Sequence, residues 1–208
     1  MEFSQIVTER RSVKSYDPDA AITDAELSAL FEQVVHTPSA FNLQHWGFVV
    51  VRDPEVKAKM QELAWGQPQV GASSAAILVT GKLDAHGDAA EIFAETPAAV
   101  QEQMLPMIEG FYTGKDQLMR DEAFRSASMA AMTLMLAAKD QGFETGPMIG
   151  FDQEGMAKLL GLPDNQVVVM LIVLGKGETP ARDRAYRRPL HEVVKFDHFD
   201  GAGLGGAN

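Results

Sequence analysis

The sequence predicts an α+β protein in which helices surround a small sheet. Residues 167–174 are apolar and mostly β-branched, which is typical of a central strand that is covered on both faces. Residues 122–141 leave almost no polar face, so they predict a helix that is buried all round. Between residues 23 and 35, apolar side chains recur at the spacing of one helical face, which predicts a second strong helix.

The first half of the chain predicts helices that alternate with strands. An amphipathic start at residues 3–7 precedes the helix that Thr23 and Glu26 begin as a capping box and that Pro38 ends. The elements expected next are a strand, a surface helix, a short helix and a second strand, at residues 46–51, 55–63, 67–75 and 76–80.

Residues 84–120 are compatible with helix but are repeatedly interrupted, which predicts an excursion of short helices. The interrupting residues are Gly87, Pro97, Pro106, Gly110 and Gly114. The part at 93–120 has the composition of a lid, because Phe111 and Tyr112 stand beside glycine hinges. A plain pair of surface helices is the alternative.

The last third of the chain predicts fewer elements. Gly142 is expected to end the long buried helix, and residues 152–160 predict another short helix. We expect residues 1–200 to form a single domain and residues 201–208 to be a disordered tail.

The composition is that of an ordinary globular protein and excludes several classes of function. The formal net charge of −11 argues against nucleic acid as a partner, because nucleic-acid binding requires broad cationic surfaces. The absence of cysteine excludes disulfides, thiol nucleophiles and zinc–thiolate sites. The five histidines form no i, i+4 pair, so we expect no metal site. A G-x-G-x-x-G pattern near the C-terminus lacks the strand and helix that dinucleotide binding requires.

The sequence also predicts where the protein resides. The N-terminus lacks the charged and apolar regions of a signal peptide. The longest aliphatic run, residues 167–174, is too short to cross a bilayer. We therefore expect a soluble cytoplasmic protein without a membrane partner.

Half of the positive charge lies in two short stretches near opposite ends of the chain. They hold nine of the 18 Lys and Arg residues, namely Arg10, Arg11, Lys14, Lys176, Arg182, Arg184, Arg187, Arg188 and Lys195. Because guanidinium groups bind phosphate oxygens through two donors at once, these clusters predict an anion site. The alternative is solvated surface charge.

Three local patterns predict a ligand site. The sequence R-R-S-V-K-S-Y at residues 10–16 combines cations with hydroxyl donors. The sequence P-S-A-F-N-L-Q-H-W at residues 38–46 places amide side chains, which both donate and accept, between a helix and a strand. The sequence P-M-I-G-F-D at residues 147–152 puts Gly150, which allows a close approach of the backbone, ahead of a helix. Taken singly, the second pattern is more often typical of a turn.

Taken together and in this order, with R-R-P-L at residues 187–190, these patterns resemble the FMN-dependent nitroreductase family. The resemblance covers almost the whole chain. It implies a three-layer α/β/α sandwich with a small, mostly antiparallel central sheet. It also implies a homodimer with two FMN sites at the subunit interface, in which an extended arm at residues 190–199 crosses to the partner and adds a strand to its sheet.

The resemblance implies roles for the cations. Arg10, Arg11 and Ser12 are expected to hold the phosphate and ribityl chain of FMN, and Arg187 the phosphate again. Lys14 is expected at the pyrimidine edge of the flavin, where a cation would stabilise the negative charge of the reduced ring. No catalytic side chain is expected, because the flavin carries the chemistry.

The resemblance also implies contacts to the flavin ring. The residues expected to pack on the flavin of the other subunit are Pro38, Ser39, Ala40 and Asn42. Ile149 and Gly150 are expected to present backbone near the flavin N5 and O4, and the excursion with Phe111 and Tyr112 to stack on flat acceptors. Gln67 is expected to reach the pyrimidine edge of the flavin. This chain departs from many relatives at residues 65–69, where they carry an Asn and a Lys and this chain has G-Q-P-Q at 66–69, and at Ala185, where some relatives have Lys.

The activity implied is that of an NADH- or NADPH-dependent FMN oxidoreductase. The nicotinamide donor reduces the flavin, leaves, and an electron-poor acceptor such as a nitroarene or a quinone takes the electrons in a ping-pong cycle. Related flavoproteins reduce enones or dehalogenate phenols, which is one alternative. The other is a flavin-binding storage or sensor protein without turnover.

Overall fold

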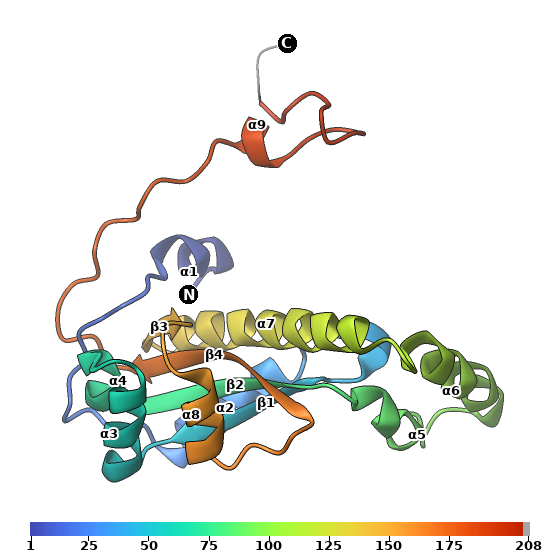
Figure 1. The fold of residues 1–208 in the computed structure, drawn as a ribbon. Helices are drawn as coiled ribbons and strands as arrows, with labels where there is room; N and C mark the ends of the chain where they lie inside the picture. The colour runs from blue at the N-terminus through green and yellow to red at the C-terminus, as the bar shows by residue number, and fades with distance from the viewer. Residues whose placement is uncertain (206–208) are drawn as a thin grey trace.

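The chain folds around an antiparallel sheet with strand order β1-β2-β4-β3 (Figure 1). The computed structural model describes residues 1–205 of the 208-residue chain. The strands are β1 (Trp46–Val51), β2 (Ala75–Lys82), β3 (Glu144–Met148) and β4 (Gln166–Gly175). The expected central strand at 167–174 is confirmed as β4, which pairs with β2 on one side and β3 on the other.

Helices and short helical turns make up most of the remaining structure. They are α1 (Phe3–Glu9), α2 (Asp24–Val34), η1 (Ala40–Asn42), α3 (Pro54–Leu63), α4 (Pro68–Ala72), η2 (Ala85–Asp88), α5 (Ala89–Ile92), α6 (Ala98–Tyr112), α7 (Asp116–Asp140), α8 (Gln153–Leu159) and α9 (Leu190–Val193). The expected capping box begins α2, because the Glu26 N–H donates to Thr23 Oγ1 at 3.2 Å and the Thr23 N–H donates to Glu26 Oε2 at 2.8 Å.

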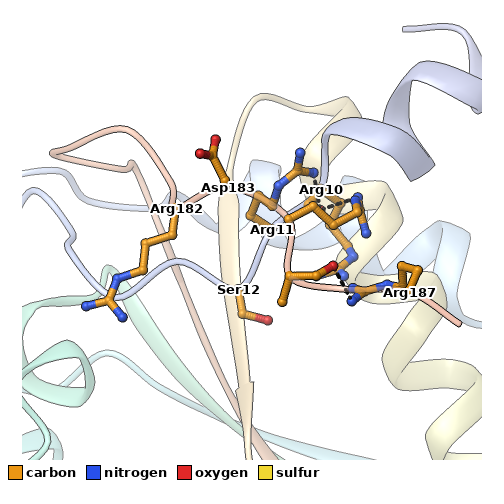
Figure 2. A pocket seen from close by; sticks show the side chains of 8 residues that line it. Arg10, Arg11, Ser12, Arg182, Asp183 and Arg187 are labelled. Atoms are coloured by element: carbon orange, nitrogen blue, oxygen red, sulfur yellow. Dashed lines mark hydrogen bonds between the residues drawn. The ribbon is translucent and has the colours of Figure 1, made fainter.

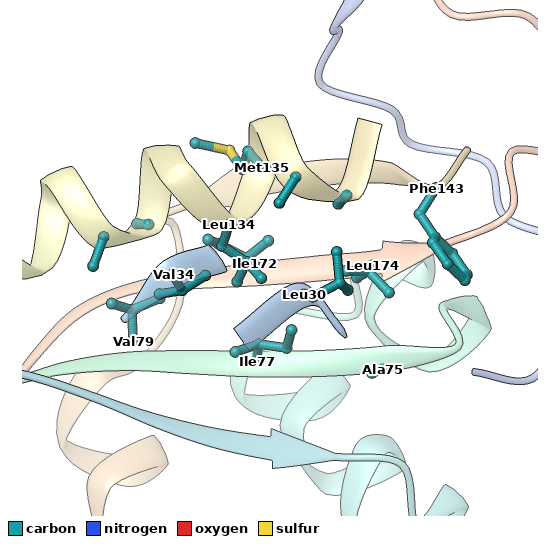
Figure 3. Close-up of a cluster of buried hydrophobic side chains, with 14 of the residues drawn as sticks. Leu30, Val34, Ala75, Ile77, Val79, Leu134, Met135, Phe143, Ile172 and Leu174 are labelled. Carbon is teal, nitrogen blue, oxygen red and sulfur yellow. The ribbon is translucent and has the colours of Figure 1, made fainter. Parts of the chain in front are cut away.

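Two helix layers cover the sheet, which confirms the α/β/α sandwich. On one face, Leu30 of α2 and Leu134 of α7 belong to a buried cluster with Ile172 of β4 (Figure 3). On the other face, a second buried cluster joins α3, α4 and α8 to β4 through residues such as Met60 and Leu171. Leu171 and Ile172 face opposite layers because successive side chains of a strand alternate. The β-branched run therefore fills both cores.

β3 is a strand that the sequence analysis missed. Its five residues include Gly146 and Pro147, both of which are depleted in strands. Pro147 is tolerated because β3 lies at an edge of the sheet, where a residue needs ladder partners on one side only. The pattern at residues 147–152 is therefore the end of a strand and the turn that follows it.

The excursion differs from the expected run of short helices. α6 continues for 15 residues through Pro106 and Gly110. Proline removes a single backbone donor from the helix, and the burial of Ile108 and Tyr112 on the excursion's own apolar cluster offsets that loss. α7 begins at Asp116, earlier than the expected residue 122.

α7 is not buried all round within one chain. Met129 and Met132 are each 38% exposed, and Ser128 and Arg125 lie on the same exposed stripe. The expectation of complete burial was wrong for the single chain, because α2 and the sheet cover only the opposite faces of the helix. The stripe has few groups that favour contact with water.

The C-terminal arm leaves the body of the protein and runs to α9 (Figure 1). Leu190–Val193 is a helical turn, where extended chain was expected. Residues 201–205 fold back on the arm rather than being a disordered tail, since the Phe196 N–H donates to Ala202 O at 3.0 Å and Lys195 bridges Gly203. Residues 206–208 of the expected tail lie outside the described residues.

No helix within residues 1–205 has both the length and the apolar character that crossing a membrane requires.

Candidate functional site

The segment at residues 10–16 lies along the free edge of β3. The Val13 N–H donates to Thr145 O at 3.0 Å, and Ser12 forms a parallel bridge with Thr145. Gly146 makes this close approach possible, because a Cβ there would lie 2.7 Å from Val13 O. Tyr16 anchors the end of the segment in the core. The sheet edge therefore fixes the first cationic stretch in place.

A cavity of 190 Å³ joins this segment to the C-terminal arm (Figure 2). Five arginines and one aspartate are among its lining residues, which are Arg10, Arg11, Ser12, Arg182, Asp183, Arg184, Ala185 and Arg187. Figure 2 shows Arg10, Arg11 and Arg187 gathered on one side of Ser12, whereas Arg182 points away on the other side. Five cations against one anion, in a chain of net charge −11, suit a ligand with more than one negative charge.

Arg184 attaches the arm to the end of α1. Its Nη2 donates to Val7 O, Thr8 O and Arg10 O at 3.1, 2.8 and 3.1 Å. Partial removal from water, followed by the nearby guanidinium groups, lowers the pKa of Arg184 from its ordinary value. The cations are thus crowded, and an anion between them would relieve their repulsion.

Arg10 offers a donor that the rest of the chain leaves unused. Its Nη1 is buried and meets no hydrogen-bond partner among the described residues. A buried donor without an acceptor is unfavourable by about 1–3 kcal/mol, so such groups are rare unless a ligand or water completes them. This atom fits a phosphate oxygen.

The arginine cavity continues into two further cavities along residues 12–15. One of 250 Å³ is lined by Ser12, Lys14 and the arm at 179–182. The other, of 130 Å³, is lined by Ser12, Val13, Lys14, Gln67, Gln69, Gly146, Pro147, Met148 and Val173. Because Ser12 lines all three, we call them together the 10–15 trough. The trough has a cationic end at the arginines and a second end at the glutamines, where Lys14 is the one charged lining residue. Because its other lining groups carry no charge, we call this second end the uncharged end.

The uncharged end is held by amide hydrogen bonds. Gln67 Nε2 donates to Gly150 O at 2.8 Å, and Gln69 Nε2 donates to Gln67 Oε1 at 2.9 Å. These bonds connect the turn before α4 with the turn after β3. They hold Gln67 beside Gly150, and the neighbouring Ile149 is 70% exposed.

The loop at residues 38–45 lies at the opposite end of the sheet. Trp46, which follows it, pairs with Gly81 near the C-terminal end of β2. Thr145, beside Ser12, pairs with Leu174, which pairs with Ala75 at the start of β2. Pro38, Ser39, Ala40 and Asn42 thus do not line the 10–15 trough of their own chain.

The same loop has an unusual backbone. Phe41, Asn42 and Gln44 have positive φ angles of 52°, 57° and 49°. This left-handed region is unfavourable for residues other than glycine, and it is tolerated by Asn better than by Phe. The Gln44 N–H donates to Ser39 Oγ at 2.9 Å, which stabilises the turn. Strained backbone is common at ligand sites.

The structure separates the two aromatic residues that were expected to stack on acceptors. Phe111 is 44% exposed, so its ring is available at the surface. Tyr112 is 1% exposed and packs against Phe41 and His86, with ring centroids 6.1 and 5.6 Å away. The expectation for Tyr112 was wrong, because on a helix adjacent residues point about 100° apart and this one points into the core.

Two residues of the trough escaped the sequence analysis. Gln69 is buried and orients Gln67, and its signal was the repeated amide of Q-P-Q. Arg184 lies in R-D-R-A-Y-R at residues 182–187. The sequence places it in the second cationic stretch but does not indicate its hydrogen bonds to the end of α1. Only the fold brings the arm beside α1.

The fold of this chain is that of solved nitroreductase-family structures, as the comparisons with known proteins show. The Nitroreductase family model matches residues 7–176, and the chain belongs to this family. It is 41% identical over 203 residues to MhqN of Bacillus subtilis (strain 168), a protein named for NAD(P)H nitroreductase activity, with 94% of this chain and 98% of MhqN covered.

Other relatives carry further functional names. The chain is 30% identical to the CLA biosynthesis enone reductase of Lactiplantibacillus plantarum, with 94% of this chain and 91% of the relative covered. Among solved structures, a protein of Exiguobacterium sibiricum 255-15 in complex with FMN has a TM-score of 0.89 and 30% identity, with 95% and 98% of the chains covered. The fold resemblance is therefore confirmed over almost the whole chain.

Proposed function

We propose that this protein is an FMN-dependent oxidoreductase that takes a hydride from NADH or NADPH and passes electrons to an electron-poor acceptor. Membership of the Nitroreductase family and the NAD(P)H-dependent relatives support an oxidoreductase role. The observation that carries FMN as the cofactor is the five-arginine cavity with the buried, unused Nη1 of Arg10. An FMN phosphate carries a charge of about −1.5 to −2 at neutral pH, which suits this excess of cations.

The residues of the 10–15 trough have distinct tasks in this proposal. Arg10, Arg11 and Arg187 would hold the phosphate, and Ser12 would add a neutral donor beside it. Bound FMN supplies the two-electron redox chemistry, which no side chain provides. Gln67 Nε2 donates to Gly150 O and its Oε1 accepts from Gln69 Nε2. These two bonds hold the Gln67 side chain in one orientation at the uncharged end of the trough.

Lys14 is the cation nearest the uncharged end of the trough. Its exposed side chain lines both the 250 Å³ and the 130 Å³ cavities. A cation there would favour electron uptake electrostatically, because its charge opposes the negative charge that reduction brings. Among the described residues, Lys14 is the single cation that lines the glutamine end. No second cation within residues 1–205 takes the place there of the Lys that many relatives carry at residues 65–69.

The loop at 38–45 supports a dimeric site. Because this loop and the 10–15 trough lie at opposite ends of the sheet, residues of both groups can meet one flavin only if two chains combine. We propose that Pro38, Ser39, Ala40 and Asn42 of one chain complete the trough of the other in a homodimer. The exposed arm and the open edge of β1 are consistent with a strand exchanged between chains.

The acceptor is proposed to be a nitroarene or a quinone. The enone reductase relative supports a second candidate, in which an enone takes the electrons instead. Both need the same reduced flavin and differ only in what docks over it.

The test is anaerobic reduction of the purified protein by NADH and by NADPH, followed by mixing with each acceptor. The visible flavin absorption should bleach with one donor and return with at least one acceptor class. The proposal would be contradicted if the protein purifies without flavin and binds none when FMN is added. Protein that holds FMN but accepts no hydride from either donor would instead indicate a storage or sensor role.

A further inference from the structure

Trp65 has a position that the roles assigned so far do not explain. Its side chain is 72% exposed, although it is a large aromatic group that proteins usually bury at least in part. It follows α3, at a point where helices very commonly have glycine, and its φ is +56°. The next residue, Gly66, has a φ of +75°, so two successive residues of this turn are left-handed and only one of them is glycine.

The backbone at Trp65 is strained for a bulky residue. A left-handed conformation is unfavourable for residues other than glycine, because it brings Cβ close to the following carbonyl oxygen. The turn is nonetheless fully built, since the Trp65 N–H donates to Glu62 O at 3.0 Å and the Gly66 N–H donates to Gln61 O at 2.9 Å. Neither burial nor turn geometry rewards the indole, so a strained and exposed ring points to a ligand.

The ring lies beside the uncharged end of the 10–15 trough. A Cβ on Gly150 would be 3.3 Å from Trp65 Cζ3, so the indole lies against the Gly150 backbone. Gln67, two residues later, donates to Gly150 O. Ile149, which precedes Gly150, is also largely exposed, and together Trp65 and Ile149 form an apolar surface next to the glutamines.

We propose that Trp65 is a specificity-determining residue, on whose indole the neutral, electron-poor acceptor ring stacks while it faces the flavin. This inference rests on the proposed function. An electron-rich indole and an electron-poor nitroarene or quinone have complementary charge distributions on their faces. The reduced nicotinamide donor lacks this complementarity.

The surrounding charges favour an acceptor over a nicotinamide nucleotide. Glu62 lies three residues before Trp65 and is exposed. Asp152 lies on the adjoining turn, because its N–H donates to Leu63 O at 2.9 Å, and it too is exposed. These two exposed carboxylates, on the turn of Trp65 and on the adjoining turn, disfavour the diphosphate of a dinucleotide and leave a neutral ring unaffected.

The surface on which the acceptor docks is therefore expected to include residues of both chains. Trp65 belongs to the chain that holds the flavin phosphate, whereas Phe111 lies at the far end of the sheet with the 38–45 loop. In the proposed dimer, the partner's excursion and this chain's Trp65 would approach the same flavin from different sides.

The experiment measures binding of 1,4-naphthoquinone to the oxidised, FMN-loaded protein without a donor, so that no turnover occurs. The dissociation constant is read from the change in the flavin absorption band. Trp65→Ala should weaken binding about 2- to 13-fold, the range expected for one aromatic contact, and Trp65→Phe should restore most of it. Glu62→Ala, on the same turn, should bind at least as tightly as wild type.

Several outcomes would overturn the inference. The first is an unchanged dissociation constant for the quinone in Trp65→Ala. The second is equally weakened quinone binding in Trp65→Ala and Trp65→Phe, and the third is loss of FMN from Trp65→Ala. A Trp46→Phe background, in which Trp65 is the sole remaining tryptophan, gives an independent readout, since naphthoquinone should quench its fluorescence. If wild type binds the quinone through Trp65 but accepts no hydride from either donor, the proposed function fails while this inference stands.

Discussion

Arg10 has the most direct evidence for an anionic ligand at the scale of single residues. Its buried Nη1 has no protein acceptor within residues 1–205, and four further arginines line the same cavity. Arg10→Ala or Arg187→Ala should each weaken FMN binding about ten- to a hundredfold, since a charge-assisted hydrogen bond contributes about 1.5–3 kcal/mol. Flavin fluorescence titration of the apoprotein measures this change.

The control for this prediction is Arg52→Ala. Arg52 is an exposed arginine that pairs with Asp24 at 2.7 Å and lies outside the trough, so its removal changes the net charge equally. Equal weakening in all three variants would assign the effect to net charge rather than to specific bonds.

His45 predicts a dependence of stability on pH. Burial lowers the pKa of His45 from its ordinary value of 6.5; the charge of Glu122 raises this pKa by less, and His86 lowers it further. The unfolded chain therefore binds this proton more readily than the folded chain. The free energy of unfolding should be independent of His45 above about pH 6.5 and should fall as the pH drops below it.

Denaturant unfolding measured between about pH 5 and pH 8 tests this sign. His45→Gln should flatten the decline on the acid side, whatever its effect on absolute stability. His36→Gln, which changes an exposed histidine, should keep the wild-type slope. A steeper decline in His45→Gln would mean that the folded protein holds the proton more tightly, contrary to the burial argument.

At the scale of elements, α6 distinguishes a surface aromatic from a core aromatic. Phe111→Ala should change the ranking of nitroarene and quinone acceptors and leave FMN content unchanged, because its ring is exposed at the excursion's surface. Tyr112→Ala should lower the free energy of unfolding by about 3–5 kcal/mol, as is usual for deletion of a fully buried aromatic ring. Stopped-flow half-reactions and denaturant unfolding separate the two effects.

The elements that could be predicted from the sequence are those with a clear local pattern of apolar or capping residues. The β-branched run of β4 and the capping box of α2 depend on local patterns, and the structure has both. β3 could not be predicted, because Gly146 and Pro147 oppose strand structure and only the neighbouring β4 and residues 12–13 hold it in place. Pro106 was expected to interrupt the helix and does not. The tertiary packing of α6 outweighs the local penalty of the proline.

The candidate site followed the same rule. Arg10, Arg11, Ser12 and Arg187 belong to motifs that the sequence displays, and the fold brings these four to one cavity. Tyr112 was misassigned because adjacent residues of a helix cannot be told apart by composition. Trp65 and Arg184 depend on contacts between segments more than 80 residues apart, which no local pattern encodes.

At the scale of the whole molecule, the exposed stripe of α7 predicts self-association. Met129→Lys with Met132→Lys should shift the protein from dimer to monomer, because two charges would be buried without partners in the interface. Light scattering of the wild type and the double variant measures the change. Ala58→Lys, an exposed position of α3 on the other face of the sheet, should leave the mass unaltered. A wild type that is monomeric with FMN bound would contradict the proposed dimer.

The separation of the 38–45 loop from the 10–15 trough makes flavin retention a matter of mass action. If each flavin needs groups from two chains, a dilute solution loses cofactor by dissociation of subunits as well as by release from the site. The occupied fraction at fixed FMN should then fall as the protein itself is diluted. Free-flavin fluorescence, followed over a dilution series, would report subunit affinity without any label on the protein.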